Sequence, residues 1–428
     1  MFIPEQPLAL SPNNFSMGNS SSWGRALVWS LIAAAFIGPG TVTTATRAGT
    51  EGGFLYIPTV ALAAIAGLLL MEMAARLTLV SGRPLGAVLG QGNRWLAWLC
   101  FLAVLLGCAA YQAGNLLGAL GGVQLLAEVP RWCVLLFGLL IATLMWGGKT
   151  ATIARWLAAI VSVMGLIFMV VAVGLIAGED SLAGQRQINP ATVVALVGTT
   201  IVPYNFFLAA GLSHGQGLGE MRRGLFASFL VGAVITLSII LVGGVTDAFS
   251  GFEDLARTLD ARMSGQGAVV LGFGLFAAGF SSAVTAPLAA AMAGRELIGR
   301  EQSSDWENRG RYFRLSWGGV LLIGLLVALL DLDIIGVIVA AQIANGLLLP
   351  FVAGLVLVFA NDRALLIDKV NSGWQNLAGL GVAVFLAYKN ADFLLQKAGI
   401  ETEWTAYALT ILYLLIISGL LWARRQNR

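Results

Sequence analysis

The sequence is poor in charged residues. Asp, Glu, Lys and Arg make up 11% of its 428 residues, whereas an ordinary soluble domain contains roughly 25%. The net charge at pH 7 is only +3, and the basic residues are scattered through short segments. This composition excludes an ordinary soluble domain. It also excludes a nucleic-acid-binding protein, because such a protein needs a dense basic surface.

Cysteine and histidine are scarce as well. Cys100, Cys108 and Cys133 lie in or beside apolar segments without a CxxC spacing, which excludes a disulfide framework and a thiolate metal site. The single histidine, His214, is either a solvated residue at a helix end or a proton relay. Neither a nucleotide-binding P-loop nor a set of nucleophile and base is present, so we expect no ATP-driven pump, no enzyme and no cofactor.

Hydrophobic residues, at 58%, fill long runs instead. Because about 20 apolar residues cross a bilayer as a helix, we predict an all-α protein with about twelve transmembrane helices in residues 23–423. Residues 1–22 are predicted to form a flexible N-terminal tail and residues 424–428 a short C-terminal tail. The predicted spans are 25–48, 54–79, 96–126, 131–148, 152–178, 189–213, 224–248, 267–294, 314–332, 334–360, 373–389 and 404–423.

The distribution of Lys and Arg predicts the orientation of these spans. Most of them fall in segments that the predicted spans place on one side of the membrane, including 295–314 and 424–428. Since basic residues accumulate on the cytoplasmic side, both termini are predicted to be cytoplasmic, in a bacterial-type inner (plasma) membrane.

Glu72 lies four residues before Arg76, a spacing that suits an ion pair within one helix. A role of Glu72 in permeation is the alternative.

Two predicted spans contain helix-breaking residues near their middle. The first carries Gly-Pro-Gly at 38–40, and the sixth carries GTTIVPYN at 198–205. Pro39 and Pro203 either kink their helices or interrupt them. Paired interruptions followed by polar residues are typical of transporters built from two inverted repeats, which bind substrate at the breaks. We therefore predict repeats at about 25–178 and 189–360, followed by two extra helices at about 373–423.

Five segments resemble the Nramp family of divalent-metal transporters, which have the LeuT-type fold. The resemblance runs along almost the whole chain after the N-terminal tail. The segments are GPGTVTTATRAGTEGGFLYIPTV from residue 38, MEMAARLTLVSGRPLG from 71, GTTIVPYNFFLAAGL from 198, GLFAAGFSSAVTAPLAAAMAG from 274 and AAQIANGLLLPF from 340.

The resemblance also implies a set of site residues, in which the family's metal ligands are largely replaced. The family has Asp-Pro-Gly-Asn at the first break and Met-Pro-His-Asn at the second. Of the family's side-chain metal ligands, the resemblance implies that only a glutamine is kept, as Gln342. The predicted substrate-binding residues are Gly38, Gly40, Thr41, Thr44, Thr199, Val202, Tyr204, Asn205 and Gln342. Gln112 and Asn115 stand where the resemblance places the family's acidic proton-path residues.

A neutral pocket disfavours a bare divalent ion, which normally requires an anionic ligand. The sequence therefore favours a secondary transporter for a small neutral, zwitterionic or carboxylate-bearing solute, with no bound metal. Two alternatives stay open: a divalent-metal transporter with an atypical site, and a non-transporting sensor. Either sodium or protons can drive a symport. Ser281, Ser282 and Thr285 can ligate sodium, or else they simply allow close helix packing.

Overall fold

The computed structural model describes residues 37–90, 94–147, 150–178, 187–213, 216–299, 304–307, 309–399 and 403–426. The predicted tail 1–22, the first part of the first predicted span and His214 lie outside these residues. Every regular element within the described ranges is a helix. The predicted all-α class is therefore confirmed for this part of the chain.

The helices follow one another with short connections. They are α2 (Pro39–Gly52), η1 (Gly53–Tyr56), α3 (Ile57–Ser81), α4 (Leu85–Leu89), α5 (Arg94–Gln124), η2 (Arg131–Cys133), α6 (Val134–Gly147), α7 (Thr150–Ala177), α8 (Pro190–Thr200), α9 (Pro203–Leu212), α10 (Leu218–Gly243), α11 (Phe252–Asp260), α12 (Gly267–Leu297), η3 (Ser304–Trp306), α13 (Arg311–Leu329), α14 (Ile334–Phe359), α15 (Arg363–Leu366), α16 (Gly373–Lys397) and α17 (Glu403–Gln426).

Ten segments of the described chain are long and apolar enough to cross a membrane. The sequence predicted about twelve spans, and the two counts differ in how short helices are treated. One of the ten segments, Pro39–Ser81, contains both α2 and α3, while α6 belongs to a shorter apolar helical stretch, Arg131–Gly147. The protein is thus an integral membrane protein, with helices close to the predicted spans.

Two helices differ clearly from their predicted bounds. The span predicted at 224–248 is α10, which begins earlier, at Leu218, because Arg222 is held inside it by Glu72 of α3 at 2.8 Å. The span predicted to end at 389 is α16, which continues to Lys397. Its extension is anchored by Asn390, whose side-chain amide donates to the carbonyl of Gly346 in α14 at 2.7 Å.

The predicted ion pair within α3 is present. A guanidinium nitrogen of Arg76 lies 3.4 Å from a carboxylate oxygen of Glu72. Arg76 also donates to the carbonyl of Lys369 at 2.7 Å and to the side chain of Asn371. Together with Arg222, these residues join α3 to α10 and to the segment between α15 and α16.

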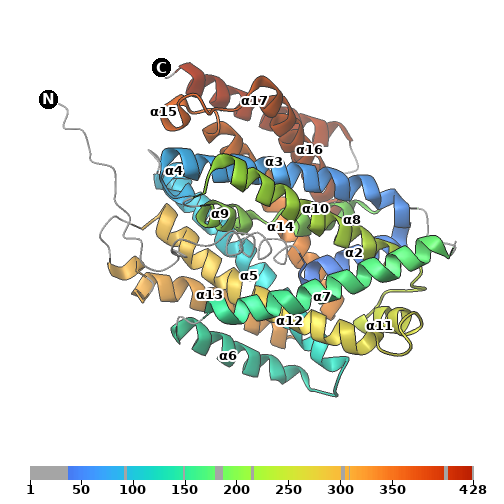
Figure 1. Cartoon of the computed structure of the whole chain (residues 1–428). Helices are drawn as coiled ribbons and strands as arrows, with labels where there is room; N and C mark the ends of the chain where they lie inside the picture. The colour runs from blue at the N-terminus through green and yellow to red at the C-terminus, as the bar shows by residue number, and fades with distance from the viewer. Residues whose placement is uncertain are drawn as a thin grey trace.

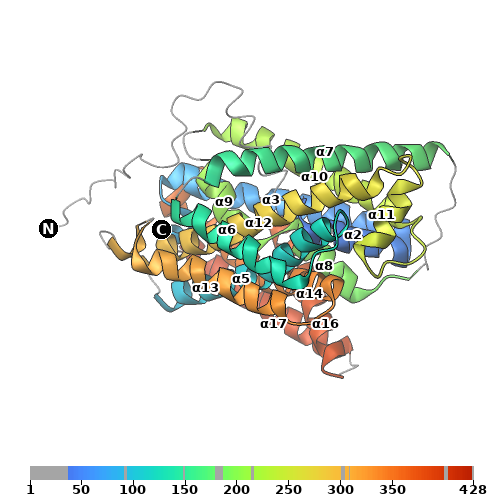
Figure 2. The same cartoon turned by 90° about the horizontal axis from the view of Figure 1, so that it is seen from below.

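The helices that contain the two predicted breaks lie inside the bundle. α2 packs against α8, α10 and α14, and α5 packs against α12, α13 and α14. Figure 1 shows α16 and α17 along one edge and α6 along the opposite edge, with α5, α9 and α14 between them. In Figure 2, after a quarter turn, α7 lies along the upper edge and α16 and α17 lie below.

Glycine allows α2 and α10 to touch through their backbones. A Cβ on Gly49 would lie 2.3 Å from the carbonyl oxygen of Ile240, and one on Gly243 would lie 2.5 Å from that of Thr46. Small residues permit this approach between membrane helices. α2 therefore packs closely against α10.

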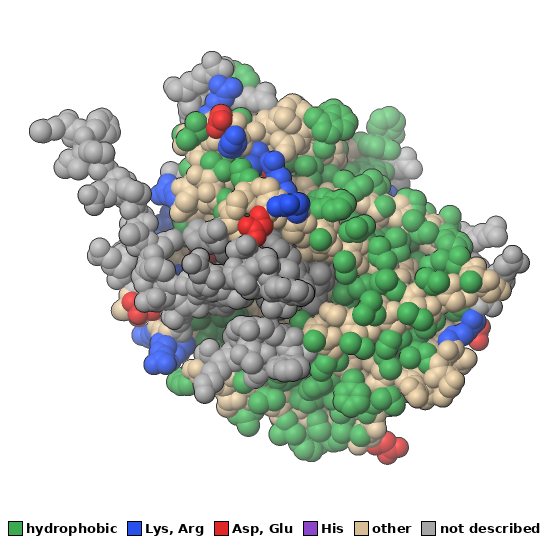
Figure 3. All heavy atoms as spheres, in the orientation of Figure 1, with side chains coloured by type: hydrophobic (Ala, Val, Ile, Leu, Met, Phe, Trp, Pro, Cys, Tyr) green, Lys and Arg blue, Asp and Glu red, His purple; other side chains and the backbone are tan. Residues whose placement is uncertain are grey.

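Apolar side chains cover much of the outer surface. Figure 3 shows them spread over the visible face, while charged side chains gather mainly along its left side, from the top to the lower left, and at its right margin. Exposed apolar side chains occur along several of the long helices, as a lipid-facing surface requires. Examples are Ile65 in α3, Leu106 in α5, Leu139 in α6, Val170 in α7 and Leu415 in α17.

Candidate functional site

Both predicted breaks have irregular backbone at the expected residues. Gly38 is extended, with φ −97° and ψ 176°, and α2 begins directly after it at Pro39. α8 ends at Thr200, Ile201 is extended with φ −120° and ψ 90°, and α9 begins at Pro203. Proline suits the first helical position because its φ is already helical and its missing N–H needs no partner there.

Four neutral side chains from four helices meet beside these breaks. The hydroxyl oxygens of Thr41 (α2) and Thr199 (α8) lie 2.9 Å apart. Tyr111 (α5) donates its hydroxyl to the side-chain oxygen of Gln342 (α14), and Thr199 lies close enough to affect this hydroxyl electrostatically. All four side chains are buried. We call Thr41, Tyr111, Thr199 and Gln342 the central cluster.

Two glycines make room for Gln342. A Cβ on Gly40 would lie 2.0 Å from the side-chain nitrogen of Gln342, and one on Gly198 would lie 2.0 Å from its backbone oxygen. Any larger residue at either position would therefore displace Gln342 or its helix. The glutamine is seated between the start of α2 and the end of α8.

The other predicted binding residues surround this cluster less closely. The ring of Tyr204 meets that of Tyr111 edge to face, with centroids 5.9 Å apart. Gly38 faces α12, where its Cβ position lies 3.7 Å from the hydroxyl of Ser282. Val202 and Thr44 are fully buried, and no described hydrogen bond joins Thr44 to the central cluster.

Asn205 is an unpartnered polar side chain beside the second break. It lies in the first turn of α9 and is 2% exposed. Neither its amide oxygen nor its amide nitrogen has a hydrogen-bond partner among the described residues. A buried amide in this state costs free energy unless a ligand or water completes its bonds.

The described side chains of the site carry no formal charge. Within the described residues there is no group of three or more His, Cys, Asp or Glu residues that could hold a metal. The available donors are hydroxyl and amide oxygens together with backbone carbonyls. The starts of α2 and α9 add partial positive charge at the breaks.

Gln112 and Asn115 lie on α5 close to the central cluster but form different contacts. The amide nitrogen of Gln112 donates to the carbonyl of Ala283 in α12 at 3.0 Å. In a regular helix this carbonyl would accept from residue 287, which is proline and has no N–H. Asn115 is buried, and its amide nitrogen has no partner in the described chain.

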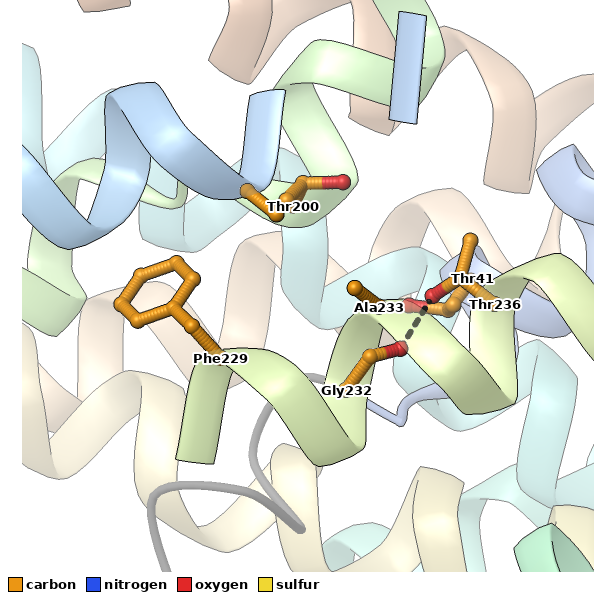
Figure 4. Close-up of a pocket in the computed structure, with 7 residues that line it drawn as sticks. Thr41, Thr200, Phe229, Gly232, Ala233 and Thr236 are labelled. Atoms are coloured by element: carbon orange, nitrogen blue, oxygen red, sulfur yellow. Dashed lines mark hydrogen bonds between the residues drawn. The ribbon is translucent and has the colours of Figure 1, made fainter. Parts of the chain in front are cut away.

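A small cleft adjoins the central cluster at Thr41. It is partly open to the surroundings, has a cavity volume of about 10 Å³, and is lined by Thr41, Ala64, Thr200, Phe229, Gly232, Ala233 and Thr236. Figure 4 shows the hydroxyl of Thr236 bonded to the carbonyl of Gly232, a distance of 2.8 Å. Thr200 likewise bonds within its own helix. These two hydroxyls are therefore satisfied inside their helices.

Sequence reasoning missed Tyr111 as part of the site. It lies next to Gln112 in a continuous helix, so no break or proline marked it. The available signal was a tyrosine in the middle of an apolar helix, because a buried phenol hydroxyl needs a hydrogen-bond partner. In the structure, Tyr111 is 7% exposed.

Comparison with known proteins covers most of the chain. The family model described as natural resistance-associated macrophage protein-like matches residues 30–396. The divalent metal cation transporter MntH 1 of Pseudomonas aeruginosa is 25% identical over 400 residues, which span 85% of this chain and 89% of the relative. The divalent metal cation transporter MntH of a Nostoc species is 23% identical over 430 residues, spanning 89% and 93%.

Solved structures share the fold. A mutant of the Eremococcus coleocola manganese transporter superposes with a TM-score of 0.70 at 17% identity, covering 95% of this chain and 96% of that chain. The nucleobase-cation-symport transporter Mhp1 gives 0.57 at 14% identity, covering 94% and 93%. MhsT in complex with L-phenylalanine gives 0.60 at 14% identity, covering 88% and 98%. The predicted LeuT-type fold is confirmed.

Proposed function

Since this chain belongs to the natural resistance-associated macrophage protein-like (Nramp-like) family of membrane transporters, we propose that it carries a divalent metal cation by alternating access. The observation that carries this proposal is the full-length similarity to relatives named as divalent metal cation transporters. The sequence favoured an organic solute instead, because the site lacks a carboxylate. That preference receives no support from the comparisons, and the metal cation, its alternative, is the better proposal.

The donors of the central cluster favour a hard cation. Hydroxyl, amide and carbonyl oxygens suit Mg²⁺, Ca²⁺ and Mn²⁺, whereas sulfur and imidazole suit softer transition metals. Val202 and Tyr204 stand where the family resemblance places Met and His. We therefore propose that the cargo is a hard divalent ion.

A neutral site is compatible with such an ion if the ion keeps part of its water shell. Mg²⁺ loses its waters reluctantly and usually retains several when bound. A retained shell reduces the desolvation cost that an anionic ligand would otherwise have to offset. Asn205 and Gln342 can then bond to these waters, and Asn205 has both amide atoms available for them.

The spacing within the central cluster also supports an ion. Thr41 and Thr199 are within hydrogen-bond distance of each other, and so are Tyr111 and Gln342. The oxygens of Thr41, Thr199 and Gln342 can therefore converge on one small cargo. We propose that movement of the interrupted spans opens this cluster to each side in turn, with inverted repeats at about 25–178 and 189–360.

The proposal also includes cytoplasmic termini and a coupling ion, either sodium or a proton, that drives transport.

A small polar organic solute is the second candidate. The neutral charge of the described site and the positive ends of α2 and α9 favour it. The two candidates differ in which solute the protein should take up in a transport assay.

Uptake into liposomes that contain the purified protein tests the proposal. We expect uptake of Mg²⁺ or Mn²⁺ and weaker uptake of Cd²⁺, and no uptake of labelled amino acids or small carboxylates. Gln342→Leu removes a central oxygen and should reduce cation uptake at least tenfold. The matched control Gln396→Leu, on the exposed face of α16, should leave uptake unchanged. Uptake of an organic solute without any cation would refute the proposal.

A further inference from the structure

We propose that Tyr111 determines the affinity of the central site, because its hydroxyl occupies the oxygen of Gln342 until the cargo displaces it. This inference rests on the proposed function and names a residue that the family resemblance does not assign. It makes Tyr111 a competitor of the cargo and not a ligand. Three observations carry it.

The first observation is that the Gln342 amide is confined on two sides. Its oxygen accepts from the Tyr111 hydroxyl. Its nitrogen lies over Gly40, so closely that a Cβ there would come within 2.0 Å. If the amide turned over, its nitrogen would face the phenol oxygen, and Tyr111 could no longer donate to Gln342. The oxygen therefore faces Tyr111 whenever the site has the described conformation.

The second observation is that Tyr111 itself is held in place. Its ring packs edge to face on Tyr204, at an interplanar angle of 86°. Its helix neighbour Gln112 is anchored to the carbonyl of Ala283. Gly324 of α13 packs against Gln112 so closely that a Cβ there would lie 2.3 Å from its Cγ. α5 thus presents the Tyr111 hydroxyl to Gln342 from a fixed position.

The third observation is that the hydroxyl of Tyr111 lies beside the pair of threonines at the two breaks. Tyr111 is electrostatically close to Thr199, whose hydroxyl lies 2.9 Å from that of Thr41. Two neutral hydrogen-bonded pairs, Tyr111 with Gln342 and Thr41 with Thr199, are therefore neighbours among α14, α5, α8 and α2. In the absence of cargo, these pairs satisfy groups that would otherwise be buried without partners.

The chemistry makes this arrangement competitive. A phenol that donates to Gln342 points its proton toward the oxygen that a cation, or a water of its shell, must approach. The cargo must break this bond before it can use the oxygen. Because a typical hydrogen bond contributes about 0.5–1.5 kcal/mol net, its removal should tighten cargo binding by roughly two- to tenfold.

Tyr111→Phe tests this inference because it removes only the hydroxyl. We expect the KM for cation uptake to fall about two- to tenfold. Tyr413→Phe is the matched control. Tyr413 of α17 also donates its hydroxyl to α14, at the backbone carbonyl of Pro350, over 2.7 Å. The control should keep the wild-type KM. An unchanged KM in Tyr111→Phe would overturn the inference, and a raised KM would show that the hydroxyl is a ligand.

A second measurement needs no cargo and separates this inference from the proposed function. Tyr111→Phe should lower the Tm of the purified protein, yet cause no further change in a Gln342→Leu background, where its partner is gone. Equal Tm shifts in both backgrounds would mean that the two side chains are not coupled, and the inference fails. Absence of cation uptake by the wild-type protein would refute the proposed function alone.

Discussion

Gly40 is the position in the site where an added side chain would meet the end of the Gln342 side chain directly. The Cβ of any other residue would lie 2.0 Å from the amide nitrogen of Gln342 and 2.5 Å from its Cδ. These atoms belong to the end of a flexible side chain, so the helices can stay in place while the glutamine moves away. A larger residue at position 40 should therefore disturb the binding site more than it disturbs the packing of the helices.

Gly40→Ala should accordingly impair transport more than stability. Displaced Gln342 can no longer offer its oxygen to the cargo, and we expect cation uptake to fall at least tenfold. The Tm should change by only a few degrees, because about 1 kcal/mol moves the Tm by roughly 2–4 °C in a chain larger than 150 residues. Gly381→Ala is the matched control, since a Cβ there meets nothing within 4 Å. A large Tm loss with normal uptake of the folded fraction would contradict this expectation.

The residues of the site were predictable only where a local pattern marked them. Glycine and proline beside threonine in an apolar span indicated Gly40, Thr41 and Thr199, because unwound backbone in a membrane must face a polar cavity. Gln342 came from the family resemblance. Tyr111 carried no such mark, since its role arises from a contact between residues 231 positions apart, which only the packing of α5 against α14 establishes.

At the scale of helices, two prolines and two amides form a repeated arrangement. Pro287 lies inside α12 and Pro350 inside α14. Each removes the N–H that would bond to the carbonyl four residues earlier. Those carbonyls belong to Ala283 and Gly346. Each one accepts from an amide side chain of a neighbouring helix, Gln112 at 3.0 Å and Asn390 at 2.7 Å.

Removal of Gln112 should therefore destabilise the protein through α12. Gln112→Leu leaves the carbonyl of Ala283 buried without a donor, which costs about 1–3 kcal/mol. We expect a Tm several degrees below that of the wild-type protein in the same detergent. Gln396→Leu serves again as the control, since Gln396 bonds only at the surface to Asp392 at 3.0 Å. Equal Tm values for the two variants would show that Gln112 does not stabilise α12 at Pro287.

The positions of the helices could be predicted from hydropathy, whereas the residues at which they begin and end could not. Apolar runs of membrane length predicted the described helices because backbone polar groups in lipid must be satisfied within a helix. The start of α10 and the end of α16 depend instead on Arg222 with Glu72 and on Asn390 with Gly346. These partners lie far apart in the sequence, so no local pattern contains them.

For the whole molecule, the important feature is that α2 and α8 are tied at both ends. Near the breaks, Thr41 meets Thr199. At the far end of α2, Thr192 of α8 donates to a carboxylate oxygen of Glu51 at 2.7 Å. Tyr56 donates to the same oxygen at 3.1 Å, and its own hydroxyl oxygen accepts from the backbone N–H of Asn189 at 2.7 Å. We infer that α2 and α8 move as one unit.

Glu51→Gln tests whether this far contact keeps the two helices together. One carboxylate oxygen accepts from Thr192 and Tyr56, and the other accepts from Arg47 at 2.8 Å. An amide keeps one acceptor and turns an NH₂ group toward a donor on the other side, so at least one bond is lost. The side chain is 23% exposed, and hydrogen bonds to charged groups contribute about 1.5–3 kcal/mol when fully formed. We expect a destabilisation of about 1 kcal/mol after discounting for this exposure.

The measurement is thermal unfolding in detergent together with cation uptake in liposomes. Glu51→Gln should lower both the Tm and the maximal uptake rate, because separate movement of α2 and α8 breaks the alignment of Thr41 with Thr199. The KM should change less, since the central cluster itself keeps its atoms. Glu128→Gln, at an exposed position after α5, removes the same charge without a described partner and should change neither quantity. If Glu51→Gln and Glu128→Gln behave alike, the two helices are held together by the central contact alone, and the far end of α2 has no part in transport.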